Sequence, residues 1–130
     1  MEQPVEKVFP SVEPTRDAKQ LADDLCRALL TPREGEEMAR LLADLCTPAE
    51  IRTLAERWHV ARLLETTDLS YRDIHDATGV STTTIVRVAR FLRQEPFQAY
   101  RMAMERLPEK WEPAFREGRT SNKEREMNDD

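Results

Sequence analysis

A cluster of hydroxyl and arginine side chains near the middle of the chain is the part of the sequence best suited to bind another molecule. Between Ser81 and Arg93 there are three arginines and no acidic residue, although the whole chain carries a net charge of −5. A local positive cluster on an acidic protein can still bind phosphate groups, while the net charge predicts weak non-specific binding. Small hydroxyl side chains near a helix N-terminus let the helix enter the major groove of DNA, and arginine can contact bases or phosphates. The outward-facing positions, which we expect to contact DNA, are Ser81, Thr82, Thr83, Val86, Arg87 and Arg90.

These side chains need a scaffold, and residues 71–90 fit the helix-turn-helix pattern with Gly79 at the turn. A sharp bend between two short helices commonly needs a residue with positive φ, which glycine adopts without steric cost. His75 departs from the pattern, because its position usually holds a small residue. We therefore predict a helix-turn-helix from Ser70 to about Leu92. The positions at which its helices must touch each other and the core are Ile74, Val80, Ile85 and Val88.

The other helices are predicted from apolar spacing and from start signals. Helices are expected at about 16–30, 32–45, 48–65, 71–77, 82–92 and 96–107. Thr31-Pro32-x-Glu34 and Thr47-Pro48-x-Glu50 each combine a capping hydroxyl, a proline and a carboxylate, which is typical of a helix start. The helix that follows Thr47 has the widest apolar face, so we expect it at the centre of the protein. In the last helix the residues expected to face inward are Phe97, Tyr100, Met104 and Leu107.

The chain divides into three parts by composition. Residues 1–14 hold three prolines among charged residues and predict a flexible N-terminal arm. Residues 15–107 form the helical domain, and the charged residues 108–130 predict a mostly disordered tail. With 35% charged residues, 6% aromatic residues and three glycines, the composition favours an all-α fold.

Several classes of protein are excluded by missing signals. The sequence has no export leader and no run of about 18 apolar residues, which predicts a cytoplasmic protein without a membrane partner. Cys26 and Cys46 have no metal-ligand spacing, so we expect reduced thiols in the core and neither a metal nor a cofactor. No nucleophile motif or phosphate-binding loop is present, and the chain is not expected to be an enzyme.

The stretch from Asp44 to Leu92 resembles the Trp repressor superfamily and is most similar to its YerC/YecD-like branch. The motifs that carry this resemblance are Thr47-Pro48, Leu54 to Arg57, the Leu63-Leu64 pair, and TGVSTTTI from Thr78 to Ile85. The resemblance implies an intertwined all-α homodimer of about six short helices. It also implies that the second helix of the helix-turn-helix lies in the major groove.

Some residues are assigned a role only through this resemblance. Arg72 matches an arginine that contacts a base edge, and His75 stands where the family has a phosphate-contacting lysine, so both join the expected DNA-binding set. Arg57 and Arg87 match the two arginines around the tryptophan corepressor, and Thr47 matches a threonine of that pocket. These three residues define an expected effector pocket.

Tryptophan itself is not the expected ligand of this pocket. Val88 and Phe91 stand where the repressor has glycine and serine, and two bulky side chains would fill the space that an indole needs.

The sequence therefore predicts a sequence-specific DNA-binding transcriptional regulator, a repressor, that places its helix-turn-helix in the major groove of double-stranded DNA. One alternative is a helical protein-interaction module without DNA binding, in which the outer face of the helix-turn-helix binds another protein. A second alternative is a regulator that senses a small metabolite other than tryptophan.

Overall fold

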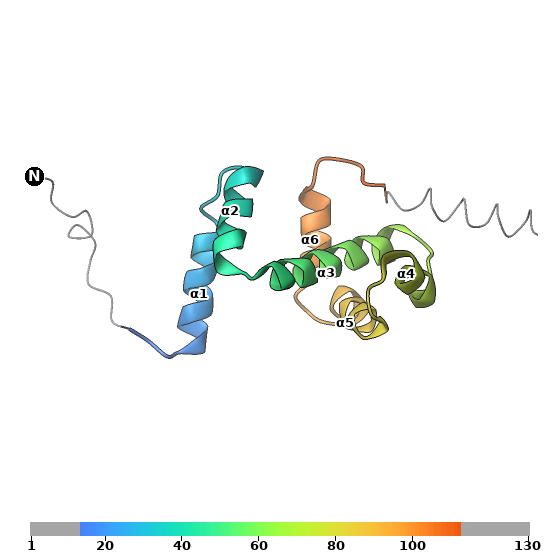
Figure 1. Ribbon diagram of the computed structural model, residues 1–130, viewed down its shortest axis with the longest axis horizontal. Helices are drawn as coiled ribbons and strands as arrows, with labels where there is room; N and C mark the ends of the chain where they lie inside the picture. Colours follow the sequence, from blue (N-terminus) through green and yellow to red (C-terminus); the bar gives the residue numbers. More distant parts are fainter. Residues whose placement is uncertain (1–13, 113–130) are drawn as a thin grey trace, which may run out of the picture. The chain divides into compact units, whose positions relative to one another are not determined.

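The computed structural model describes residues 14–112, which form six α-helices and no strand (Figure 1). The predicted all-α fold class is therefore confirmed. Contacts divide the chain into a unit that ends at Cys46 and a unit that begins at Thr47. The predicted arm, apart from residue 14, and the predicted tail, apart from residues 108–112, lie outside the described residues. The helices are α1 (Ala18–Leu29), α2 (Gly35–Leu45), α3 (Pro48–Thr66), α4 (Tyr71–Thr78), α5 (Thr82–Arg93) and α6 (Ala99–Arg106).

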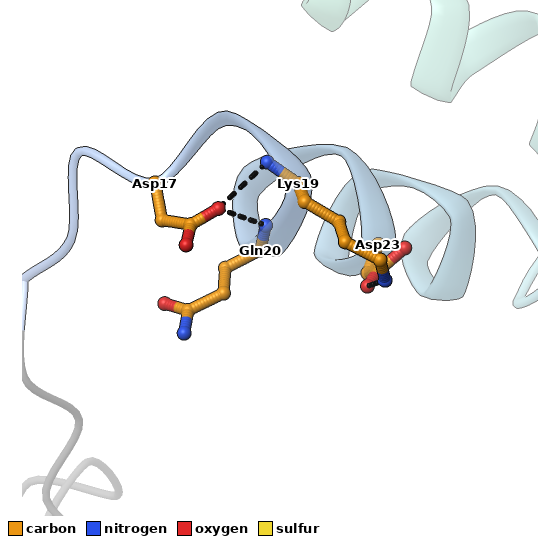
Figure 2. A network of polar contacts seen from close by, with 4 residues as sticks. All are labelled: Asp17, Lys19, Gln20 and Asp23. Carbon is orange, nitrogen blue, oxygen red and sulfur yellow. Dashed lines mark hydrogen bonds and ion pairs between the residues drawn. The ribbon is translucent and has the colours of Figure 1, made fainter.

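A carboxylate caps the start of α1. Asp17 Oδ1 accepts hydrogen bonds from the backbone amides of Lys19 (2.9 Å) and Gln20 (3.2 Å), as Figure 2 shows. Lys19 Nζ also lies 2.7 Å from Asp23 Oδ2, one turn along the helix. The cap provides acceptors for first-turn amides that have no partner inside the helix. It explains why α1 begins at Ala18, whereas the sequence predicts a start at about residue 16.

The predicted start of the second helix is wrong. Thr31 does not cap α2, because its Oγ1 donates instead to the carbonyl oxygen of Ala28 (2.7 Å), near the end of α1. Glu37 Oε1 accepts the backbone amide of Arg33 (2.7 Å), and α2 begins only at Gly35. A threonine close to the end of one helix can bond back to that helix, and here this local bond competes with the capping role.

The predicted capping box at the start of α3 is present. Thr47 Oγ1 accepts the backbone amide of Glu50 (3.1 Å), and Glu50 Oε1 accepts the amide of Thr47 (2.8 Å). In the unit that begins at Thr47, α5 packs against α3 and α4, and α6 packs against α3 and α5. Only the second half of α3 contributes to the core, which consists of Val60, Ala61, Leu63, Leu64, Ile74, Val80, Ile85, Val88, Ala89 and Leu92.

The last helix begins later than predicted. Pro96 and Phe97 lie in a turn, and the helix starts after Gln98, whose φ of 51° is left-handed. Gln98 Nε2 donates to the backbone oxygen of Glu95 (2.8 Å), which holds the turn. Phe97 is 74% exposed, so the prediction that it faces the core is wrong. The left-handed residue breaks the helical path that the apolar spacing assumed.

The inward face of α6 is only partly as predicted. Tyr100 and Met104 pack against the core, as predicted. Leu107 is 41% exposed, so its predicted inward orientation is wrong. Trp111 takes a place against the core beyond the end of α6.

An arginine between two indole rings ties residue 111 to α3. The guanidinium carbon of Arg62 lies 5.1 Å from the ring centroid of Trp58 and 4.9 Å from that of Trp111. Tyr100 stacks on Trp58, with ring centroids 6.3 Å apart, and His59 meets Trp111 edge-on at 5.6 Å. Cation–π and aromatic contacts of this kind each add to the area that the rings bury.

The turn between α4 and α5 is fixed by hydrogen bonds on both sides of Gly79. Gly79 has a φ of 76°, as predicted, and its amide donates to the carbonyl oxygen of His75 (2.8 Å). Thr78 Oγ1 donates to the carbonyl oxygen of Ile74 (2.6 Å) and accepts the amide of Val80 (3.1 Å). The polar backbone groups of the turn are thus largely satisfied within the turn itself.

We expect Gly79→Ala to lower the free energy of unfolding by about 1–2 kcal/mol, because an L side chain is strained at positive φ. Crowding does not contribute, since a Cβ at Gly79 or at Gly35 meets no described atom within 4 Å beyond its chain neighbours. Gly35→Ala is the matched control, and helix propensity predicts equal or higher stability for it. Urea unfolding measures both variants. Equal losses in the two variants would contradict the assignment of strain to Gly79.

Stability is expected to depend on pH through His59. The pKa of His59 is lowered from its usual 6.5, mainly by burial and to a smaller extent by the charge of Arg62. The unfolded chain then binds a proton more readily than the folded chain, so stability should be lost as the pH falls below 6.5 and be retained above it. His59→Gln should flatten this decline. Melting temperatures of both proteins between about pH 5 and 8 test this expectation, and parallel curves would count against it.

Candidate nucleic-acid interface

One face of α5 is buried and the opposite face is open, as predicted. Its buried residues are Ile85, Val88, Ala89 and Leu92, which with Ile74 and Val80 hold α4 and α5 together. All six positions predicted to face outward are exposed: Ser81, Thr82, Thr83, Val86, Arg87 and Arg90. We call this set the α5 outer face.

The hydroxyl groups at the start of α5 have two different roles. Ser81 Oγ accepts the backbone amide of Thr84 (3.2 Å) and donates to Thr84 Oγ1 (3.0 Å), so it caps the helix. Within residues 14–112, no such bond occupies the hydroxyls of Thr82 and Thr83. Their side chains, next to the positive end of the helix dipole, remain available to an outside partner.

The arginines of α5 differ in their surroundings. The guanidinium carbon of Arg87 lies 4.4 Å from the centroid of the half-buried Phe91 ring. Arg90 forms an ion pair with Glu95, with 2.7 Å between Nη2 and Oε1. Arg93 Nη1 donates to the hydroxyl of Tyr71 (3.4 Å), which links the last turn of α5 to the first turn of α4.

Sequence reasoning missed Glu95 as part of this surface. Glu95 lies five residues after Arg90 and outside the helix, whereas helical spacing pairs residues three or four apart. The only signal in the sequence was its position as the first acidic residue after the acid-free segment.

The two expected contacts on α4 are both exposed. Arg72 lies in the first turn of α4, next to the capping residue Ser70. His75 Nδ1 lies 2.7 Å from the carbonyl oxygen of Val80. Because a carbonyl only accepts, Nδ1 carries the proton, and Nε2 is the nitrogen left for an outside partner.

Two residues of the expected effector pocket, Thr47 and Arg57, lie far apart within one chain. Thr47 caps the start of α3, and Arg57 lies ten residues further along the chain, about 15 Å along the helix axis. Arg57 is half-buried, and its Nε is buried without a hydrogen-bond partner. Val88 is fully buried in the core, and Phe91 lies against Arg87.

Within residues 14–112, no group of three or more His, Cys, Asp or Glu side chains is arranged to hold a metal ion. Cys26 and Cys46 are both free thiols, but Cys26 is exposed and Cys46 is only partly buried, so their predicted place in the core is wrong. Of the helices between residues 14 and 112, none is long and apolar enough to cross a membrane.

Comparisons with known proteins agree with this geometry. The family model for the Trp repressor protein matches residues 20–108. The uncharacterized protein YerC of Bacillus subtilis (strain 168) is 42% identical over 87 residues, which is 67% of this chain and 82% of YerC. A TrpR-like protein of Eubacterium eligens ATCC 27750 has a similar crystal structure, with a TM-score of 0.64, 34% identity, and coverage of 72% of this chain and 94% of that one. A candidate Trp repressor from Staphylococcus aureus gives a TM-score of 0.62 and 32% identity over 81% of this chain and 94% of that one. The chain therefore belongs to the Trp repressor family, and within that superfamily to the YerC-like branch.

Proposed function

We propose that this protein is a cytoplasmic, sequence-specific transcriptional regulator, and specifically a repressor, that binds double-stranded DNA through its helix-turn-helix. The observation that carries the proposal is the α5 outer face, where small hydroxyl side chains and arginines are exposed after the turn at Gly79. Proteins of the Trp repressor family are regulators and not enzymes, which supports the same reading. In this geometry the N-terminal part of the second helix meets the base edges.

We assign different tasks to different residues of the interface. Thr82 and Thr83, at the start of α5, contact base edges with their hydroxyl and methyl groups. Arg72 contacts a base edge from α4, and Arg87 contacts the DNA from the middle of α5. Ser81, His75, Val86 and Arg90 complete the interface, with Arg90 nearest to the phosphates.

The DNA-binding unit is proposed to be a homodimer. No residue of α1 or α2 is buried, and Leu21 and Leu25 are 54% and 43% exposed on the same side of α1. Leu54, in the first half of α3, is 47% exposed. Apolar stripes of this kind are normally covered, and a second copy of the chain would cover them. The two helix-turn-helix units of the dimer, its two heads, would then meet DNA half-sites about one helical turn apart, roughly 34 Å.

A second candidate function is a regulator that also responds to a small metabolite other than tryptophan. The buried Nε of Arg57, which has no hydrogen-bond partner, favours this candidate because an unsatisfied buried donor is costly. Native mass spectrometry of the purified protein would detect such a ligand. A ligand that binds wild type but not Arg57→Ala would support the candidate, and a ligand-free spectrum from fresh lysate would count against it.

Thr82→Val tests whether the protein binds a particular sequence. Valine keeps the size of threonine but lacks its hydroxyl, so a lost hydrogen bond to a base should cost about 1 kcal/mol, or roughly fivefold, on a selected duplex. Binding to a scrambled duplex should hardly change. The duplex is first selected from random sequences with the wild-type protein, and both affinities are then measured at fixed salt.

Thr53→Val is the matched control, because Thr53 is an exposed helical threonine outside the helix-turn-helix whose hydroxyl bonds to Ala49 O. It should leave both affinities unchanged. If selection enriches no sequence and the wild-type protein binds no duplex, DNA binding is refuted. The protein-interaction module is then the better explanation of the helix-turn-helix.

Leu25→Arg tests the homodimer. A charge in the middle of the apolar stripe of α1 should prevent its burial and shift the protein towards monomer in sedimentation experiments at micromolar concentration. Gln20→Arg places the same charge on the polar side of α1 and should leave the dimer intact. A wild-type protein that sediments as a compact monomer would contradict the proposed assembly.

A further inference from the structure

Arg90, in the last turn of α5, forms an ion pair with Glu95, which follows the end of the helix. One carboxylate oxygen, Glu95 Oε1, accepts a hydrogen bond from Arg90 Nε (2.7 Å) and also lies 2.7 Å from Arg90 Nη2. The side chain of Arg90 is 63% exposed and that of Glu95 is 24% exposed. The carboxylate is therefore the more enclosed partner, and the guanidinium is the group that can move into solvent.

The backbone holds Glu95 in this place. The carbonyl oxygen of Arg90 accepts the amides of Gln94 (2.8 Å) and Glu95 (3.1 Å), which turns the chain back at the end of α5. Gln98 Nε2 holds the carbonyl oxygen of Glu95 from the other side (2.8 Å). Glu95 is thus bound to the helix by main-chain and side-chain contacts that do not depend on its carboxylate.

Among the three arginines of α5, only Arg90 has a carboxylate partner in the described part of the chain. Arg87 lies over Phe91, and Arg93 donates to Tyr71. Glu95 therefore neutralises one cation of the segment from Ser81 to Arg93, which has no acidic residue of its own.

For Arg90, the ion pair with Glu95 and a contact with a DNA phosphate are close in free energy. An exposed ion pair contributes at most about fivefold to an equilibrium. One phosphate contact, with a salt slope of about 0.9, contributes about eightfold at 0.1 M salt relative to 1 M. Whether Arg90 stays with Glu95 or moves to a phosphate is then decided by how well other contacts hold the helix in register.

We propose that Glu95 is a positioning residue that keeps Arg90 away from the phosphates of non-cognate DNA and releases it on the cognate site. The inference rests on the proposed function and deepens it. On random DNA nothing fixes the register of α5, and the ion pair persists. On the cognate site the base contacts place a phosphate within reach of Arg90. Glu95 thereby raises the ratio of specific to non-specific affinity.

Glu95→Gln tests this directly, because glutamine keeps the shape of the side chain without its charge. On a scrambled duplex the affinity should rise by up to about eightfold at 0.1 M salt, and the salt slope should steepen by about 0.9. On the selected duplex the slope should stay the same and the affinity should rise less than about fivefold. Salt titrations of both duplexes give all four quantities.

Three further variants separate this role from a structural one. Arg90→Ala breaks the same ion pair without freeing a cation, so it should not reproduce the gain on scrambled DNA. The double variant Arg90→Ala/Glu95→Gln should lose the gain. Glu105→Gln, on α6, removes the same charge outside the ion pair and should leave the slope unchanged.

The failure of this inference is distinct from that of the proposed function. If the wild-type protein selects a sequence but Glu95→Gln changes neither affinity nor slope on scrambled DNA, only the role of Glu95 is refuted. A gain that persists in the double variant refutes it as well, because the effect is then one of net charge. If no variant binds any duplex, both proposals are refuted.

Discussion

The left-handed turn at Gly79 is the constraint on which the rest of the interface depends. It sets how α4 and α5 lie against each other, and its bonds leave few polar groups to be satisfied from outside. With this angle fixed, Ile74, Ile85 and Val88 can all be buried in one core. Burial of one side of α5 then determines which residues remain on the other side. The DNA-binding face proposed for α5 is therefore a consequence of the packing beneath it, and Thr82 and Thr83 stand there because they are not needed for it.

His75 shows how this constraint competes with function. A small residue at its position could not form the bond that the imidazole makes to Val80 O, which adds to the side-chain bonds of Thr78 in the same turn. The ring is then oriented by the fold, and a contact to phosphate could use only Nε2. The same side chain braces the turn and limits the ways in which it can meet DNA. An interface residue that is shared in this way is a rigid contact, which favours recognition of a defined backbone geometry.

Local signals in the sequence predict most of the fold, because the turn and most caps need only neighbouring residues. The caps at Thr47 and Ser70 and the left-handed Gly79 are of this kind. The predictions fail where two local bonds compete or where the partner is distant. Thr31 bonds to the preceding helix and not to the next one, and Trp111 finds a place against α3 that no helical spacing indicates. Likewise the exposed face of α5 was predictable from periodicity, whereas the pairing of Arg90 depends on the non-helical path of the chain after residue 93.

The exposed apolar residues of α1 and the low positive charge of the proposed DNA interface are connected. If the proposed function holds, a single helix-turn-helix offers few phosphate contacts, because the chain is acidic overall and one of the three arginines of α5 is already paired. Weak binding by one head is useful only if two heads act together, since joining them makes the second contact intramolecular and multiplies the affinity. The exposed leucines of α1 are available to supply such a joint. In the proposed dimer, apolar packing between the two chains would thus raise the affinity for DNA beyond that of one helix-turn-helix. It would do so only for DNA sites whose half-sites have the correct spacing.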